Sequence, residues 1–303
     1  FGSVVLTPGK TYTFTNGRTQ TITQGIVANG TCYAPVNIVS SSATAQTSFY
    51  KEDGNITVSY ASLRGINATG GALFTAENSI DQGNNSGWTF VEVPQNLYWV
   101  GGTGNWNDIN RWAAESGGAG GYCLPTRLDH VIFDQNSFSQ TGQAVWINVA
   151  NAECRDMDWS DVAFAPTFTT TSASNNLKIY GSLTLSQQMN FAFTGIVYFE
   201  GKTPSKSSHL IKMAGKVFSN DVYFSEVGGI WTLQDALTIT NNDLYLNHGE
   251  LNTNGKTVSV RRFISTNNNI RSLNLGASQF NICLLYTSPS PRDRTRSRMP
   301  SSA

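Results

Sequence analysis

The chain has little charge and no long apolar run. Only 13% of its 303 residues are Asp, Glu, Lys or Arg, and it contains no stretch of about 18 consecutive apolar residues. The lack of a long apolar run argues against a membrane-spanning helix, so we expect no membrane insertion. Aromatic residues make up 11% of the chain, and Gly, Ser, Thr and Asn are abundant. This composition is poor for helices and favours many short strands joined by polar turns.

Common catalytic motifs are also missing. Neither G-x-S-x-G, a P-loop nor H-E-x-x-H occurs in the sequence. The segment Gly101 to Gly104 is rich in glycine, but no helix-forming segment follows it, so it does not predict a phosphate site. We expect His209 and His248, in strand or turn contexts, to be ordinary surface residues. No catalytic residue and no cofactor is predicted.

The end of the chain changes character abruptly. Cys283 to Asp293 can be back-translated into a string that resembles the transposon mosaic-end adapter of short-read sequencing libraries, and Arg296 to Ala303 resembles the outer flow-cell end. The alternative is a genuine disordered tail rich in Pro, Ser and Arg. We interpret residues 283–303 as translated adapter and expect them to be disordered. Phe1 is not an initiator methionine, so we expect a fragment that is open at both ends.

Removing this tail changes the charge. Lys plus Arg falls from 20 to 16 and Asp plus Glu from 20 to 19, which gives a formal net charge of −3. The only basic run of the chain lies in the tail, so the sequence predicts no nucleic-acid partner.

Three cysteines then remain: Cys32, Cys123 and Cys154. None belongs to a CxxC pair or lies near a histidine, and a zinc site needs four clustered ligands, or three with water, so no metal site is predicted. Cys123 with Cys154 could form one disulfide in an oxidising compartment, and the alternative is two buried free thiols.

The first third of the chain predicts alternating strands with turns at Asn-Gly and Asp-Gly pairs. Apolar or β-branched residues recur at period two in four segments: Lys10 to Phe14, Thr19 to Thr23, Val36 to Val39 and Ile56 to Leu63. The block ends with Gly87-Trp-Thr-Phe90, which resembles the closing rung of bacterial right-handed parallel β-helix domains. We therefore assign residues 1–90 to the C-terminal part of a first β-helix module and residues 91–97 to a linker.

A new module opens after the linker. The segment Tyr98 to Trp112 has the pattern W-x-G-G-x-G-x-W followed by a further Trp, and Leu124 to Phe138 follows it. Together they resemble the start of repeat modules in very large secreted proteins of Bacteroidota-type bacteria. The resemblance implies a secreted, cell-surface location and export through a C-terminal sorting domain. We assign residues 98–282 to a second, truncated β-helix module.

Short strands in this second module define rungs of roughly 20 to 30 residues. The segments that mark them are Leu177 to Tyr180, Ile196 to Phe199, Asp221 to Phe224, Asp243 to Leu246 and Ser272 to Leu275. The sequence therefore predicts an all-β fold of right-handed parallel β-helix modules in tandem. A β-sandwich array is the alternative, because period-two strands fit both folds.

Carboxylates and tryptophans are the side chains to consider for function. Asp156 and Asp158 lie on the same side of a strand, and an enzyme would need such groups to converge with a Lys or Arg; we interpret them as polar residues of a strand edge and turn. Asp129 and Asp134 flank an apolar strand, where carboxylates accept hydrogen bonds from turn amides.

The tryptophans at the module junction are the candidate binding residues. Trp99, Trp106 and Trp112 could stack on sugar rings or pack within the junction. The sequence favours a non-catalytic extracellular surface protein of the adhesin type, with glycans or other surface proteins as partners. The alternatives are a carbohydrate-active β-helix enzyme, a polysaccharide lyase or hydrolase, and a glycan-binding module.

Overall fold

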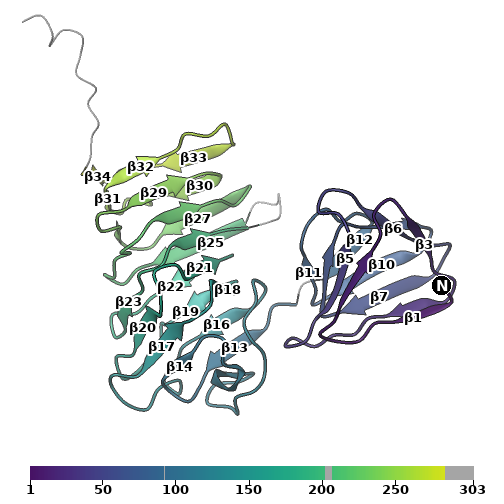
Figure 1. The fold of residues 1–303 in the computed structure, drawn as a ribbon. Helices are drawn as coiled ribbons and strands as arrows, with labels where there is room; N and C mark the ends of the chain where they lie inside the picture. The colour runs from purple at the N-terminus through teal and green to yellow at the C-terminus, as the bar shows by residue number, and fades with distance from the viewer. Residues whose placement is uncertain (92, 202–206, 284–303) are drawn as a thin grey trace, which may run out of the picture.

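The computed structural model describes residues 1–91, 93–201 and 207–283. Its parallel strands stack into a β-solenoid of about 12 turns, which confirms the predicted fold and not the β-sandwich array (Figure 1). None of the described residues forms a helix long and apolar enough to cross a membrane. Of the segment interpreted as adapter, residues 284–303 lie outside the described residues. Cys283 is described, and its N–H donates to Val260 O.

The first module contains four sheets, ordered β1-β4, β3-β6-β9, β11-β8-β5-β2 and β12-β10-β7. All of its strand pairs are parallel among the described residues. Its strands are β1 (Ser3–Val5), β2 (Thr11–Phe14), β3 (Thr19–Thr21), β4 (Gly25–Val27), β5 (Val36–Ser40), β6 (Thr47–Lys51), β7 (Asn55–Ser59), β8 (Ala61–Arg64), β9 (Ile66–Gly70), β10 (Leu73–Glu77), β11 (Ile80–Asp81) and β12 (Trp88–Val91).

The second module is built around a nine-stranded sheet and a six-stranded sheet, β18-β21-β24-β26-β29-β32. Its elements are β13 (Asn96–Trp99), β14 (Gly104–Asn105), the 3-10 helix η1 (Ile109–Arg111), β15 (Trp112–Ala113), β16 (His130–Ile132), β17 (Ala144–Ile147), β18 (Asn151–Cys154), β19 (Met157–Asp158), β20 (Thr167–Thr170), β21 (Asn176–Ile179), β22 (Leu183–Thr184), β23 (Asn190–Ala192), β24 (Val197–Phe199), β25 (Ser207–Lys212), β26 (Val222–Phe224), β27 (Gly229–Leu233), β28 (Leu237–Thr238), β29 (Asp243–Leu246), β30 (Gly249–Asn252), β31 (Val258–Val260), β32 (Arg262–Ile264), β33 (Arg271–Asn274) and β34 (Phe280–Ile282).

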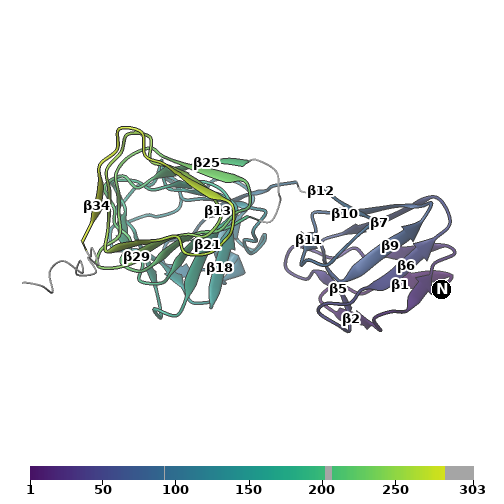
Figure 2. The same ribbon diagram turned by 90° about the horizontal axis from the view of Figure 1, so that it is seen from above.

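Alternation within each strand builds the core of this module. In β24 and β26 the first and third residues are buried and the central tyrosine faces outward. Because the strands pair in register, Phe199 lies directly opposite Phe224, and their rings stack with centroids 4.8 Å apart. Seen along the axis in Figure 2, the coils enclose this apolar interior. Inward side chains are thus buried against the coils above and below them.

Four of the five predicted rung markers lie in one sheet, as β21, β24, β26 and β29. The fifth segment is also a strand, as predicted, but it does not continue this sheet. The segment Ser272 to Leu275 overlaps β33, which belongs to the nine-stranded sheet on another side of the coil. The true successor of β29 is β32, where Leu244 pairs with Phe263.

The two modules have separate hydrophobic cores. One core runs from Leu6 to Ala76 and the other from Leu97 to Val260. Since Leu97 is fully buried in the second core and β13 already begins at Asn96, the predicted linker of residues 91–97 is too long at its C-terminal end. Figures 1 and 2 both show the first module beside the end of the second module that carries β13, not stacked on it.

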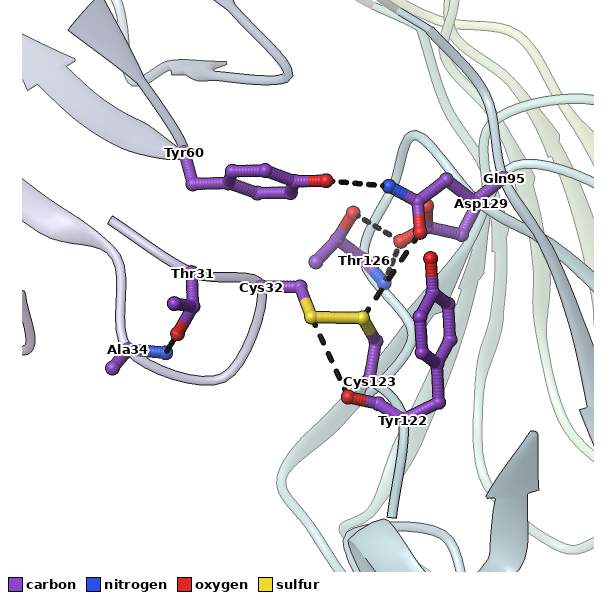
Figure 3. Close-up of a disulfide and its surroundings, with 9 residues drawn as sticks. All are labelled: Thr31, Cys32, Ala34, Tyr60, Gln95, Tyr122, Cys123, Thr126 and Asp129. Carbon is purple, nitrogen blue, oxygen red and sulfur yellow. Dashed lines mark hydrogen bonds between the residues drawn. A yellow bond between two sulfur atoms is a disulfide. The ribbon is translucent and has the colours of Figure 1, made fainter. Parts of the chain in front are cut away.

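A disulfide joins the modules across this junction (Figure 3). It links Cys32 of the first module to Cys123 of the second, with a sequence separation of 91 and a Cα–Cα distance of 5.5 Å. The predicted pairing of Cys123 with Cys154 was therefore wrong. Cys154 is a buried free cysteine, because it is an inward-facing residue of β18. Beside the disulfide, Gln95 Nε2 donates a 2.9 Å hydrogen bond to the hydroxyl of Tyr60.

Thiol labelling tests this pairing. Under denaturing, non-reducing conditions we expect alkylation of Cys154 and Cys283 only, and of all four cysteines after reduction. A Cys32→Ser/Cys123→Ser variant should keep its circular dichroism, because each module retains its own core, but small-angle X-ray scattering should show a larger radius of gyration. Cys283→Ser is the matched control. A peptide linking Cys123 to Cys154 in the mass spectrum would contradict the structure.

Candidate functional site

The three candidate tryptophans are structural. Trp99, Trp106 and Trp112 are 0%, 3% and 0% exposed, so none offers a face to a sugar ring. Trp112 packs edge-on against both of the others, with ring centroids 5.1 and 5.0 Å apart. The Nε1–H groups of Trp99 and Trp112 donate to the backbone carbonyls of Gly102 and Trp106.

The strand that contains Trp112 explains why these residues cluster. β15 is the terminal strand of the nine-stranded sheet and pairs antiparallel with β13, the one antiparallel pair among the described strands. It therefore closes the end of the solenoid, and the rings cover the interior that the first coil would expose. Of the two roles predicted for these side chains, packing is correct and glycan stacking is wrong.

Substitution of Trp106 should separate packing from binding. We expect Trp106→Ala to lower the free energy of unfolding of the second module by roughly 3–5 kcal/mol, because it leaves a cavity in the end cap. Trp146→Ala is the control, since Trp146 is 38% exposed in β17, and it should cost about 1 kcal/mol or less. Urea denaturation followed by tryptophan fluorescence measures both. Equal stabilities would refute the packing role.

Three of the four candidate carboxylates serve turns, as predicted, and Asp156 does not. Asp158 Oδ1 accepts from Ser160 N, and Asp134 Oδ1 accepts from Asn136 N. Asp129 Oδ2 accepts from both the amide and the hydroxyl of Thr126. Burial nevertheless raises the pKa of Asp129, because it outweighs these hydrogen bonds. No Lys or Arg forms an ion pair with Asp156 or Asp158 within the described ranges.

Asp156 instead pairs with a histidine. Its Oδ2 lies 2.6 Å from Nδ1 of His130, and its Oδ1 accepts from the backbone N–H of Ser182. Burial alone would raise the pKa of Asp156, but the hydrogen bonds from His130 and Ser182 outweigh it, and the pKa is lowered. The carboxylate therefore stays ionised and ties the first coils of the module together.

The carboxylate of Asp156 should contribute to the free energy of unfolding only at pH values above the range in which it titrates. A pKa lowered by folding means that the ionised group stabilises the fold at neutral pH, and that this contribution disappears as the pH falls below about 3.9, the unfolded value. Asp156→Asn should therefore cost about 1–2 kcal/mol at pH 7 and much less at pH 3. Urea unfolding at both pH values measures the difference. Asp161→Asn, at an exposed position, should change little, and an equal cost at both pH values would contradict the assignment.

A cavity lies elsewhere, at the module junction. A groove of about 440 Å³ is lined by residues of both modules, and we call it the junction groove. Its volume falls within the roughly 300–1,000 Å³ of small-ligand pockets. Its lining residues are Asp81, Phe90, Arg127, Leu128, Arg155, Tyr180, Gly201, Ser207, His209 and Glu226.

Strand register places several of these side chains in a column. Cys154 pairs with Ile179, Ile179 with Phe199, and Phe199 with Phe224. The residues that follow these strands meet at the same corner of every coil. Arg155 comes directly after β18, Tyr180 directly after β21, and Glu226 two residues after β26. Parallel stacking thus brings together residues that are more than a rung apart in sequence.

A buried polar cluster lies in this column. Glu226 is only 3% exposed; its Oε1 accepts a 2.6 Å hydrogen bond from Ser207 Oγ, and its Oε2 lies 2.7 Å from His209 Nε2. Gly201 and Gly229 make room for it, because a Cβ atom at either position would overlap the Glu226 carboxyl group. The prediction that His209 is an ordinary surface residue was wrong: it is 8% exposed and packs beside Trp231, with ring centroids 5.8 Å apart.

This cluster does not have the arrangement of a nucleophilic triad. In a triad the serine and the acid contact opposite nitrogens of the histidine. Here Nε2 of His209 faces both Glu226 and Ser207 Oγ, which is 3.1 Å away, and the hydroxyl of Ser207 donates to Glu226. The serine proton is therefore held by the carboxylate. The cluster can offer hydrogen bonds and exchange protons, but its histidine is not placed to activate the serine.

Two arginines also line the groove. Arg127 is 8% exposed, and its NH2 donates a 2.7 Å hydrogen bond to the backbone carbonyl of Asp81 across the junction. Arg155 is partly buried, and its guanidinium makes no hydrogen bond or ion pair with any other described residue. Burial, together with Glu153 and Glu200, raises the pKa of Tyr180, so its phenol remains protonated at neutral pH.

An aromatic column on the outer face is a second surface feature. Tyr198, Tyr223 and Tyr245 stand in register on adjacent coils, with ring centroids 5.0 and 4.2 Å apart. The rings stack on one another, so they cover each other's faces and present mainly edges to a ligand. We assign this tyrosine column to coil stacking.

Sequence reasoning missed the junction groove, although one signal for it was present. His209 stands two residues before the buried Ile211 in β25, so period-two alternation places it on the inward side. The partners of His209 come from another coil and could not be read from sequence spacing.

Comparisons with known proteins add no family assignment. No protein-family model, no curated protein and no solved structure matches the chain. Within the described residues, no group of three or more His, Cys, Asp or Glu side chains is placed to hold a metal ion.

Proposed function

We propose that the chain is part of an extracellular, cell-surface protein of the adhesin type, which binds its ligand without turning it over. The observation that carries this proposal is the disulfide between Cys32 and Cys123. Disulfides persist in secreted and cell-surface proteins and are rare where thiols are kept reduced. A covalent link between two solenoid modules also suits a protein that must keep its shape outside the cell.

The junction supports a binding role. Modules joined by a short connection normally move relative to each other. Here the disulfide, the hydrogen bond between Gln95 and Tyr60, and the hydrogen bond from Arg127 to Asp81 O hold the two walls of the junction groove in place. A preformed groove binds with a smaller entropic cost than one that must be assembled by its ligand.

A carbohydrate-active enzyme is the second candidate. The observation that favours it is the contact of His209 with Glu226 inside the groove, because such a pair can transfer protons. Against hydrolysis by two carboxylates, Asp81 is the only other acidic residue among the described residues that line the groove, and its Oδ1 already accepts from Gly83 N and Asn85 Nδ2.

One experiment distinguishes the candidates. The oxidised protein is incubated with immobilised and soluble polysaccharides, and both retention and the release of reducing ends or unsaturated products are measured. We expect retention without products. Release of products by the wild type but not by Glu226→Gln would replace the binding proposal with the enzyme, and failure to retain any of the polysaccharides would refute the binding proposal.

A further inference from the structure

We propose that the junction groove binds a carboxylated saccharide of the uronic acid type, with Arg155 as the main contact of its carboxylate. The proposal rests on the proposed binding function and specifies its ligand. It is carried by three features of the groove: an arginine that forms no ion pair with any described residue, aromatic side chains from both modules, and a buried carboxylate that accepts hydrogen bonds.

The first feature is the charge of Arg155. A partly buried guanidinium loses hydration, and proteins normally offset that loss with an ion pair or hydrogen bonds. Arg155 interacts electrostatically with Asp156, but that carboxylate already receives hydrogen bonds from His130 and Ser182. The planar fork of Arg155 is therefore available for a carboxylate, which it can bind through two parallel hydrogen bonds. Arg127, which lines the same groove, adds positive charge.

The other features favour a sugar over an acidic peptide. Phe90 of the first module and Tyr180 of the second line the groove, and aromatic side chains pack well against the apolar faces of sugar rings. The two oxygens of Glu226 can accept about four hydrogen bonds, and Ser207 and His209 account for two contacts, so acceptor capacity remains. A ligand with hydroxyl donors as well as a carboxylate fits this combination, whereas a chain of carboxylates without hydroxyls would leave the remaining acceptor capacity of Glu226 unused.

The test uses the oxidised full chain and three probes: polygalacturonate, its fully methyl-esterified form, and poly-glutamate. Isothermal titration calorimetry should show binding of polygalacturonate that weakens as NaCl is added, because charge pairing is screened. The ester and the peptide should bind roughly tenfold more weakly or not at all. Equal binding of the ester would overturn carboxylate recognition, and equal binding of poly-glutamate would overturn the saccharide.

Variants locate the site. Arg155→Gln should weaken polygalacturonate binding roughly tenfold or more, and Arg155→Lys should fall between it and the wild type, because lysine keeps the charge without the fork. Arg18→Gln makes the same chemical change at an exposed position of the first module, outside the groove, and should leave binding unchanged. Thermal unfolding confirms that each variant is folded.

Further outcomes separate this inference from the proposed function. If Arg155→Gln is folded and binds as tightly as the wild type, the groove assignment is overturned while the binding function stands. If the wild type retains only neutral glycans, the ligand class is overturned. If polygalacturonate is bound through Arg155 but cleaved, the groove assignment stands and the non-catalytic function fails.

Discussion

In-register stacking of parallel coils is the constraint on which the rest of the structure depends. A single coil has too little interior to bury its own apolar side chains, so each inward residue must meet its equivalent on the next coil. Phe199 against Phe224 inside the solenoid and Tyr223 against Tyr245 outside it are consequences of the same register. Register also aligns the corners, where side chains are not committed to the core. The corner after the six-stranded sheet is where Arg155, Tyr180 and Glu226 converge.

An interior built by stacking is exposed at its ends, and the junction can be understood from that need. β15 reverses direction and brings Trp112 over the first coil of the second module, so this end is covered by the module's own residues. The first module is then free to lie beside that end. Cys32 and Cys123 both lie outside the regular strands and fix this lateral position. The same placement brings Phe90 and Asp81 to the wall of the groove.

The sequence alone predicted features that depend on residues close together in the chain, such as the strands. It missed features that depend on which coils lie next to each other. Period-two alternation predicted the strands and most rungs, because the pattern repeats along each strand. This alternation does not distinguish the faces of a coil, so Ser272 to Leu275 was grouped with strands that belong to another sheet. The disulfide was missed because spacing says nothing of modules packed side by side, although alternation in Asn151–Cys154 places Cys154 in the core. For Trp99, Trp106 and Trp112 the sequence left packing and glycan stacking open, because the pattern of residues does not show how deeply the rings are buried.

The position of the groove follows from how a solenoid tolerates polar groups. Most inward positions along the strands are apolar, because a polar side chain buried there needs a partner to offset its lost hydration. At a corner the chain turns, glycines such as Gly201 and Gly229 bring the backbone close, and a carboxylate can be buried with partners from adjacent coils. Glu226 is thereby buried with its partners, while the guanidinium of Arg155, one residue beyond its strand, forms no hydrogen bond or ion pair with another described residue. The positive charge of Arg155 is therefore available to a ligand. It lies in the junction groove, which is lined by residues of both modules.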